Sequence, residues 1–463
     1  MHATTKINDL TLIEIEDFLS DIDVDNILNS RIQKFEKAIS HYPNYYRNND
    51  RLVENNNVLS DYLFEKLTQR QILDLKGQIT GVNEKIRFCR YQKDQLFSRH
   101  QDGVYYPNSN HESKFTFLLY LNDNSCFKAG ATEFYTSKNA QFPVKTIVPK
   151  KGKLVIFDHQ IWHTGARVIK GNKYILRSDV MVQSNAASTN HQGYIWNLLQ
   201  LNDNQFLSGG RDTKIKHWNT NLELLNTIEI HSKSVIKMIS LCQMHEFVSC
   251  SRDFTVKKWH LSGEVLAVTH LDEMILNITN FKDELIIAVG TSGKMYVLDT
   301  NLQIIETIPV HHHWVWGLSI VGNNAISCCE NGNICITNIY SRKTKCLYTH
   351  DQPLFCINTE KRNVILAGAK DGTLIELSLE TKKIIKTKVH SDIIRSIVYY
   401  NQHIISCGES NKIISFDEKT KETTEVFGAK NFLQDIKLIN GFVYVAGYDG
   451  IITKLKIDPK PPF

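Results

Sequence analysis

The chain has 463 residues, and its hydrophobic fraction of 42% and charged fraction of 22% are those of an ordinary globular protein. This length exceeds what one hydrophobic core usually holds, so we expect two domains. The net charge of +5 is spread over both halves, which argues against a nucleic-acid-binding surface. The sequence shows neither a signal segment nor an apolar run of membrane-spanning length, and its ten cysteines form no CxxC pair. We therefore expect a cytoplasmic protein with reduced thiols and no membrane partner.

The first segments of the chain have apolar residues at helical spacing. Residues 10–40 and 60–76 follow this pattern and predict helices on the outside of a β-core. Between them, the polar and aromatic-rich segment 44–51 is either a surface connection or a lid that faces a substrate.

Short strands follow after Gly81. We expect strands at 114–122, 144–148, 153–157 and 174–182, separated by turns rich in Gly, Pro and Asn. Successive short antiparallel strands of this kind predict a mainly β domain, a jelly roll or cupin-like double-stranded β-helix with N-terminal helices.

The stretch 87–102 contains the chemistry around which this domain is organised. It reads as a β-strand, on which alternate residues project from one face, so His100 and Asp102 point to one place. An imidazole and a carboxylate, together with a histidine from a distant part of the sequence, make a facial triad for Fe(II). Such a triad leaves the other coordination positions of the metal open.

Two histidines compete for the third position of this triad. His159 and His163 are four residues apart, so periodicity alone does not separate them. A 2-oxoglutarate-dependent oxygenase also needs a buried cation for the far carboxylate of that dianion. Lys173 and Arg177 follow His163 by ten and fourteen residues, and a hairpin through 170–172 would fold both back beside it.

Residues 44–182 resemble the prolyl-4-hydroxylase-like branch of the Fe(II)/2-oxoglutarate-dependent oxygenases. The blocks that carry the resemblance are YRNNDR (46–51), GVNEKIRFCRY (81–91), FSRHQDG (97–103), FTFLLYLN (115–122) and HTGARVIKGNKYILRSDVM (163–181). The resemblance implies His100, Asp102 and His163 as iron ligands. We interpret His159 as a structural histidine.

The same resemblance implies the co-substrate site. Lys173 stands where the family keeps its 2-oxoglutarate-binding cation, with Arg177 as a rival, and Tyr91 and Tyr120 stand where tyrosines line the co-substrate. The segment AGATEF (129–134) departs from the family's Gly-Gly-Glu-Thr-x-Phe turn, which puts substrate contacts there in doubt.

A repeat with a period near forty residues follows the linker 185–190. Turn residues recur at steps of 39 to 41, and in the first six units a histidine precedes the innermost strand at similar steps, whereas the seventh unit lacks the histidine and an obvious outer strand. The turn residues are Asp212, Asp253, Ser292, Asn331, Asp371, Ser410 and Asp449, and the histidines are His191, His231, His270, His311, His350 and His390. This period predicts a β-propeller with one blade per unit.

The units resemble WD repeats, most closely in GGRDTKIKHW (209–218) and SRDFTVKKW (251–259). We therefore expect a seven-bladed propeller over 191–463, behind an oxygenase domain over 1–184. The histidines, including the run 311–313, are interpreted as members of structural hydrogen-bond networks.

These features predict an Fe(II)/2-oxoglutarate-dependent dioxygenase that uses dioxygen, with ascorbate a further candidate cofactor. The propeller would recruit a protein or peptide partner, and a prolyl residue is the first expectation for the hydroxylated group. A small molecule is the alternative class of substrate. The competing hypothesis is a non-catalytic propeller scaffold with a sensing or inactive oxygenase domain, and nucleic-acid dealkylation ranks third because the charge is unremarkable.

Overall fold

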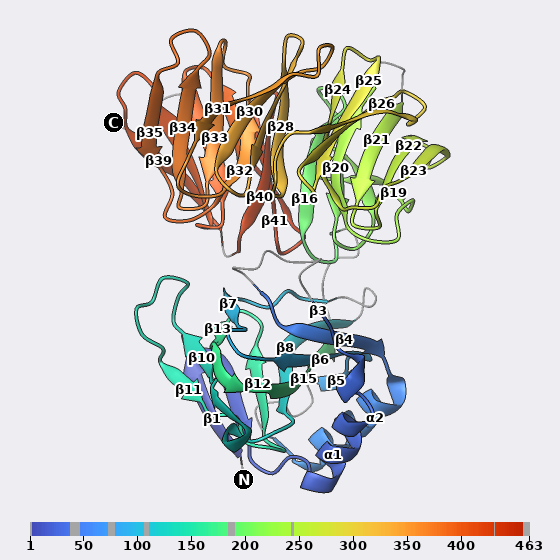
Figure 1. The fold of residues 1–463 in the computed structure, drawn as a ribbon, viewed down its shortest axis with the longest axis vertical. Coiled ribbons are helices and arrows are strands. Elements are labelled where there is room, and N and C mark those ends of the chain that lie inside the picture. The colour runs from blue at the N-terminus through green and yellow to red at the C-terminus, as the bar shows by residue number, and fades with distance from the viewer. Residues whose placement is uncertain are drawn as a thin grey trace. The chain divides into compact units, whose positions relative to one another are not determined.

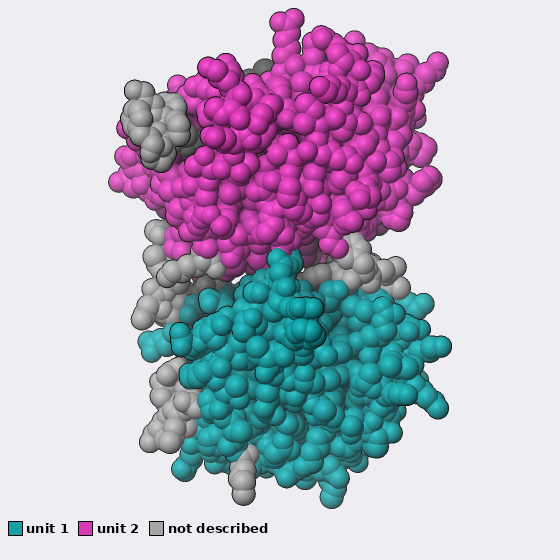
Figure 2. Space-filling model, turned by 90° about the vertical axis from the view of Figure 1, so that its left-hand side faces the viewer, with its two compact units in different colours: residues 1–188 teal, residues 189–463 magenta. Residues whose placement is uncertain are grey.

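The computed structural model describes residues 2–37, 47–72, 79–105, 111–183, 190–241, 245–429 and 431–456. The chain divides into two compact units, residues 1–188 and 189–463, coloured separately in Figure 2. Apart from Asn190, the predicted linker lies outside the described residues, and so do residues 44–46 of the expected lid segment. Each unit is described by itself below.

The first unit contains a nine-stranded antiparallel sheet (Figure 1). Its strands are, in spatial order, β1 (His2–Ile7), β2 (Leu10–Ile15), β12 (Leu154–Asp158), β8 (His111–Tyr120), β15 (Lys173–Gln183), β6 (Lys85–Tyr91), β4 (Asp50–Asn55) and β3 (Glu36–Lys37), with β5 (Ile79–Val82) paired to β15. Smaller sheets contain β11 (Lys145–Ile147), β10 (Thr132–Tyr135), β13 (Trp162–Gly165) and β7 (Phe97–His100), and the pair β14 (Val168–Gly171) and β9 (Phe127–Ala129).

Two helices cover one face of the large sheet. They are α1 (Asp21–Asn29) and α2 (Asn57–Gln69), which begin at caps where Ser20 and Asn56 accept backbone N–H groups. Short 3₁₀ turns occupy Ile32–Lys34 and Asn124–Cys126.

Side chains alternate between two cores along the strands of the large sheet. On β8, Phe117 and Leu119 belong to the core beneath the helices, whereas Leu118 and Tyr120 belong to the core on the opposite face. Because successive residues of a strand point to opposite faces, one buried strand serves both cores. The second core also contains Phe134 of the small sheet, so the two sheets enclose it.

The structure corrects the predicted helix over 10–40. Residues 10–15 form β2, which pairs with β1 and β12, and α1 is the one α-helix among the described residues of that range. Ile13 and Ile15 pack in the core beneath the helices and Leu12 in the opposite one. Apolar residues on both faces of a buried strand produce spacings that also fit a helix, which explains the error.

The stretch 87–102 is also not a single strand. It contains β6, a turn with Asp94 at φ +66°, and β7, which ends at His100. Asp102 follows β7 and is held by a backbone hydrogen bond to the carbonyl of His159, at 3.0 Å.

The second unit contains six four-stranded sheets and one three-stranded sheet among its described residues, each built from consecutive strands (Figure 1). The first three sheets are β16 (Ile195–Gln200), β17 (Gln205–Gly210), β18 (Ile215–Asn219) and β19 (Leu224–Ile228); β20 (Val235–Ser240), β21 (Glu246–Ser251), β22 (Thr255–His260) and β23 (Val265–His270); and β24 (Ile275–Phe281), β25 (Leu285–Gly290), β26 (Lys294–Asp299) and β27 (Ile304–Pro309).

The next three are β28 (Val315–Val321), β29 (Asn324–Cys329), β30 (Asn333–Asn338) and β31 (Thr344–Thr349); β32 (Leu354–Asn358), β33 (Val364–Ala369), β34 (Thr373–Ser378) and β35 (Ile384–Lys388); and β36 (Ile394–Tyr400), β37 (His403–Gly408), β38 (Lys412–Asp417) and β39 (Thr423–Gly428). The last sheet is β40 (Leu433–Ile439), β41 (Phe442–Gly447) and β42 (Ile452–Lys456). This mainly β arrangement is consistent with propeller blades.

The repeat histidines form most of the expected hydrogen-bond networks. His191 Nδ1 lies 2.9 Å from Asp212 Oδ1, and His191 Nε2 lies 2.7 Å from Ser208 Oγ. The Ser208 hydroxyl also accepts a hydrogen bond from the Trp218 indole. The same kind of network joins His231 to Asp253 and Ser249, His311 to Ser327, His350 to Tyr348 and Asp351, and His390 to Ser406 and Ser410.

His270 is the exception to this series. It is exposed at the end of β23, and in its unit the Glu273 carboxylate contacts Ser292 and Tyr296 instead. A glutamate can accept the same hydroxyl hydrogen bonds as an Asp–His pair, so the unit keeps a polar network without histidine.

No α-helix within the described ranges is both long and apolar enough to cross a lipid bilayer.

Candidate metal centre

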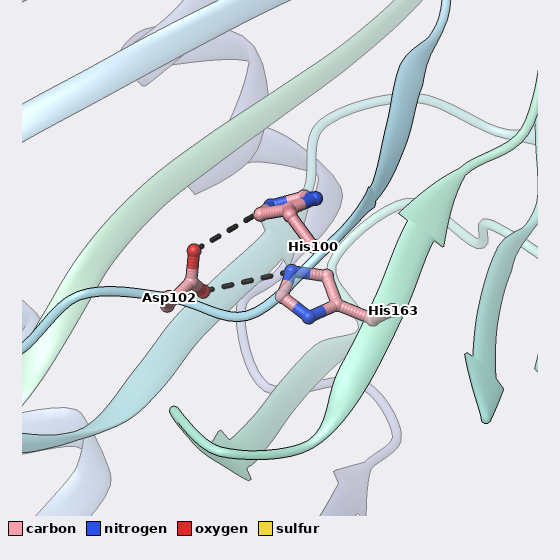
Figure 3. A group of neighbouring side chains, drawn as sticks. All are labelled: His100, Asp102 and His163. Atoms are coloured by element: carbon pink, nitrogen blue, oxygen red, sulfur yellow. Dashed lines mark ion pairs between the residues drawn. The ribbon is translucent and has the colours of Figure 1, made fainter. Parts of the chain in front are cut away.

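Three predicted side chains of the first unit converge on one place. Their ligand atoms all lie within 4.8 Å of one another, and no other set of three His, Cys, Asp or Glu side chains does so among the described residues. His100 ends β7 and Asp102 follows it, whereas His163 comes from β13, whose register places it directly opposite His100 (Figure 3). His100 Nε2 lies 3.5 Å from Asp102 Oδ1, and His163 Nε2 lies 3.6 Å from Oδ2.

The backbone fixes the orientation of both imidazoles. His100 Nδ1 lies 2.7 Å from the Ser98 carbonyl oxygen, and His163 Nδ1 lies 3.0 Å from that of Ile161. A carbonyl oxygen only accepts, so each Nδ1 must carry the proton and each Nε2 keeps its lone pair on the side of Asp102. This is the tautomer that a metal-binding histidine needs.

The protonation states of the triad also suit a cation. Burial lowers the pKa of His100, and burial together with the nearby His100 lowers the pKa of His163 to about 3, so both rings are neutral at neutral pH. Burial opposes ionisation of Asp102, but the Arg177 guanidinium and the two histidines hold the pKa of its carboxyl well below the usual range. Two neutral nitrogens and one carboxylate form the donor set of a facial Fe(II) site.

Asp102 is held from two further directions. Arg177 Nη2 lies 2.5 Å from Oδ1, and the Thr116 hydroxyl donates a short hydrogen bond to Oδ2. Thr116 lies on β8 and Arg177 on β15, so two neighbouring strands of the large sheet position a carboxylate that follows the small sheet. Neither contact was predicted from the sequence, because both depend on how the two sheets face each other.

His159 is not a member of this group. Its ring is buried, with Nδ1 3.1 Å from the Thr116 hydroxyl and Nε2 2.9 Å from the Ser113 hydroxyl. Both nitrogens therefore have hydroxyl partners on β8. The structure gives His159 the environment of a satisfied core histidine, one side chain away from Asp102.

Lys173 and the two predicted tyrosines form a second buried group. Lys173 Nζ donates to the Gly130 carbonyl oxygen at 2.6 Å and lies 5.3 Å from the ring centroid of Tyr91 and 5.7 Å from that of Tyr120. Burial lowers the pKa of Lys173 to about 7, and no carboxylate of the described residues forms an ion pair with this ammonium group. A buried cation without an anion is the feature that a dianionic co-substrate requires.

Lys173 and Arg177 share one face of β15, as predicted from their spacing, but their partners differ. Lys173 meets a carbonyl and two aromatic rings, whereas Arg177 meets Asp102. Gly130 and Thr132, to which Tyr120 donates at 2.7 Å, come from the 129–134 segment whose sequence departs from the family. That segment therefore contacts the Lys173 group through its backbone and Thr132, and these contacts do not require the missing glutamate.

Two family models match parts of this chain. Residues 86–178 match the model of the 2OG-Fe(II) oxygenase superfamily, and residues 184–219 match that of the WD domain, G-beta repeat. The comparison with curated proteins gives no match. Among solved structures, the chain is similar to the computationally designed Ika8 protein, with 18% identity, a TM-score of 0.47, and coverage of 58% of this chain and 98% of that one.

The family match spans β6 to most of β15 and so includes all three residues of the triad and Lys173. The chain therefore contains a 2OG-Fe(II) oxygenase domain, together with a WD40 repeat.

Proposed function

We propose that this protein is an Fe(II)/2-oxoglutarate-dependent dioxygenase that hydroxylates a residue, first a prolyl residue, of a protein or peptide recruited by its repeat unit. The observation that carries the proposal is the convergence of His100, Asp102 and His163, with both imidazoles oriented by backbone carbonyls. An alternative role as a non-catalytic scaffold has no physical need for three converging ligands.

His100 Nε2, His163 Nε2 and one Asp102 oxygen would hold the iron. Bound iron supplies the activation of dioxygen that is coupled to decarboxylation of 2-oxoglutarate to succinate and CO2. Arg177 and Thr116 keep Asp102 ionised and oriented, so little reorganisation is needed when the metal enters. Ascorbate, as a reductant that restores Fe(II), belongs to the same proposal.

Lys173 is the residue proposed to bind the far carboxylate of 2-oxoglutarate. Its ammonium group is buried and pairs with a carbonyl oxygen, which a carboxylate can replace with a stronger, charge-assisted bond. Tyr91 and Tyr120 flank it and would close the site against water. Arg177 is the weaker candidate, because its guanidinium already contacts the Asp102 carboxylate.

We further propose that the two sheets of the first unit form a double-stranded β-helix, and that the seven sheets of the second are blades of one propeller. Asp435 in the seventh sheet supports ring closure, because its carboxylate accepts from Asn197 in the first sheet at 2.8 Å and from Ser396 in the sixth at 2.7 Å. The backbone amide of His191, just before the first sheet, donates to the Gly450 carbonyl oxygen in the seventh sheet. The backbone amide of His350, just before the fifth sheet, donates in the same way to the Gly332 carbonyl oxygen in the fourth sheet.

The repeat unit contains a group of aromatic and arginine side chains suited to a protein partner, most of them half-buried and Phe355 buried. Four inner strands carry Trp196, Trp316, Phe355 and Arg395 at their second position, and the group also includes Tyr194 and Arg252. The Arg252 guanidinium lies 5.0 Å from the Trp196 ring, and that of Arg395 lies 4.6 Å from the Phe355 ring. Trp, Tyr and Arg dominate the binding energy of protein interfaces, so this aromatic–arginine group is the proposed docking surface.

An anaerobic titration of the metal-free full chain with Fe(II) and 2-oxoglutarate tests the enzyme proposal. The expected result is a visible charge-transfer band that needs both components and disappears in Asp102→Ala. Asp50→Asn, which changes a buried carboxylate on β4 of the large sheet that pairs with Arg90, is the control and should keep the band. A folded wild type without the band contradicts the enzyme proposal and favours the scaffold.

A separate experiment tests recruitment. Proteins captured from a lysate by the wild-type chain are compared with those captured by Trp316→Ala/Arg395→Ala and by the control Ile304→Ala/Ile305→Ala, whose residues are exposed on β27. We expect the first variant alone to lose partners, and a captured partner should become hydroxylated when iron and 2-oxoglutarate are added. Equal capture by all three proteins contradicts the proposed surface.

A further inference from the structure

Two cysteines of the repeat unit face each other across a pair of strands. Cys335 on β30 and Cys346 on β31 are register partners in the fourth sheet. Directly opposed residues of antiparallel strands have Cα atoms about 4.5 to 5.5 Å apart, which lies within the range of about 4.4 to 6.8 Å that a disulfide spans. A register shift between Ile334 and Cys335 bends the strand locally at this position.

The two thiols have different environments. Cys346 is exposed on an outer strand, whereas Cys335 is buried with its Sγ 3.8 Å from His311 Nδ1. The other ring nitrogen of His311 lies 2.8 Å from the Ser327 hydroxyl. When His311 Nε2 donates to Ser327, Nδ1 is an acceptor for the Cys335 thiol, which gives a proton acceptor beside one member of the pair.

A metal site formed by the same residues is a less well supported hypothesis. Cys329 and His311 lie nearby, but the described residues contain no group of three His, Cys, Asp or Glu ligand atoms within 4.8 Å apart from the iron triad. Two opposed thiols are instead sufficient for a disulfide, which needs only two sulfur atoms at the right separation.

We propose that Cys335 and Cys346 form a reversible disulfide when the protein meets a hydroperoxide. The exposed Cys346 thiolate attacks the peroxide, the O–O bond breaks, and sulfenic acid and an alcohol or water form. Cys335 sulfur then attacks the Cys346 sulfur, the S–O bond breaks, and the hydroxyl leaves as water with the Cys335 proton, passed through His311. The peroxide takes up the two electrons, and a dithiol restores both thiols by exchange.

The order of attack follows from exposure. Burial raises the pKa of Cys335 to about 12, so this thiol is protected from peroxide and serves as the resolving group. The bond would join β31, the outer strand of its sheet, covalently to β30, so oxidation would fix an edge that otherwise depends on hydrogen bonds and packing.

Peptide mapping of the full chain under non-reducing conditions tests the proposal. The reduced protein is treated with one equivalent of hydrogen peroxide, alkylated and digested with trypsin, which yields the peptides 295–342 and 346–361. We expect these two peptides to appear linked, with a mass two hydrogens below their sum, and to separate after dithiothreitol. Cys346→Ser should abolish the link, and it is a conservative change at an exposed position.

Two controls decide the assignment. Cys126→Ser removes the other exposed cysteine of the described chain and should leave the link unchanged. Peptide 295–342 also contains Cys328 and Cys329, so Cys335→Ser must lose the link. If the link persists in a folded Cys335→Ser, or if Cys346 in the wild type is oxidised without forming it, the proposed pair is wrong.

Discussion

Arg177 Nη2 lies 2.5 Å from Asp102 Oδ1. Arg177, the alternative to Lys173 as the co-substrate-binding cation, therefore contacts the carboxylate of a candidate metal ligand instead. The side chain of Asp102 is only 3% exposed, and an ionised buried carboxylate requires a partner of opposite charge. The two cations of β15 therefore have different tasks in our proposal: Arg177 keeps Asp102 ionised and oriented, and Lys173 meets 2-oxoglutarate.

We expect Arg177→Ala to weaken Fe(II) binding by roughly 10- to 100-fold, the usual effect of losing a group that orients a metal ligand. Without the guanidinium, burial raises the pKa of Asp102, and protons compete with the metal more effectively. Anaerobic calorimetry with Fe(II) measures this change. Arg90→Ala removes another ion pair of the same unit, with Asp50, and should leave iron affinity unchanged. Equal losses in both variants would show a general effect on folding.

The affinity for 2-oxoglutarate should depend on the protonation of Lys173. Burial lowers its pKa to about 7, and only the charged form attracts a carboxylate. We therefore expect a dissociation constant that is flat below pH 7 and rises above it, by about tenfold per pH unit at most. The always-charged Lys173→Arg should remove this rise, whereas Lys170→Met on β14 should keep it. Calorimetry with Mn(II) in place of Fe(II) measures the profile.

The same pKa gives a stability prediction with a defined sign. The folded pKa of Lys173 lies below its unfolded value of about 10.5, so the unfolded chain binds the extra proton between about pH 7 and 10.5. Its contribution to the free energy of unfolding should therefore rise with pH across this window in the ligand-free protein. Urea unfolding of the wild type and Lys173→Met at several pH values checks this, since the variant should lack that part of the rise.

Substitution of His159 should affect stability and leave the metal site intact. Its two nitrogens contact Thr116 and Ser113, so His159→Gln should cost about 1 to 3 kcal/mol in the free energy of unfolding. The charge-transfer band should survive, because the ring is not among the three converging ligands. His163→Gln should lose the band. Retention by His163→Gln and loss by His159→Gln would reverse the assignment.

The repeat histidines should divide into two classes on substitution. His231 is buried between Asp253 and Ser249, so His231→Ala should lower the free energy of unfolding by about 1 to 3 kcal/mol. His270 is exposed, and His270→Ala should stay within about 0.5 kcal/mol. Thermal unfolding followed by calorimetry distinguishes them, and similar shifts would contradict the division.

Much of the fold follows from local sequence patterns. The strands predicted at 114–122, 153–157 and 174–182 correspond to β8, β12 and β15, and the forty-residue period corresponds to consecutive sheets. These signals are local, since strand alternation and turn residues act within a few positions. The assignment of 10–15 as helix was wrong because both faces of that strand are buried.

The sequence by itself determined which residues could form an iron site, and it placed His100 and Asp102 two positions apart. Only the tertiary structure decided that His163 lies opposite His100 while His159 turns to Thr116 and Ser113. Likewise, the spacing of the two cations on β15 predicted a shared face but not the contact of Arg177 with Asp102. The physical reason is that contacts between sheets depend on register and packing between segments far apart in the chain, which local periodicity does not encode.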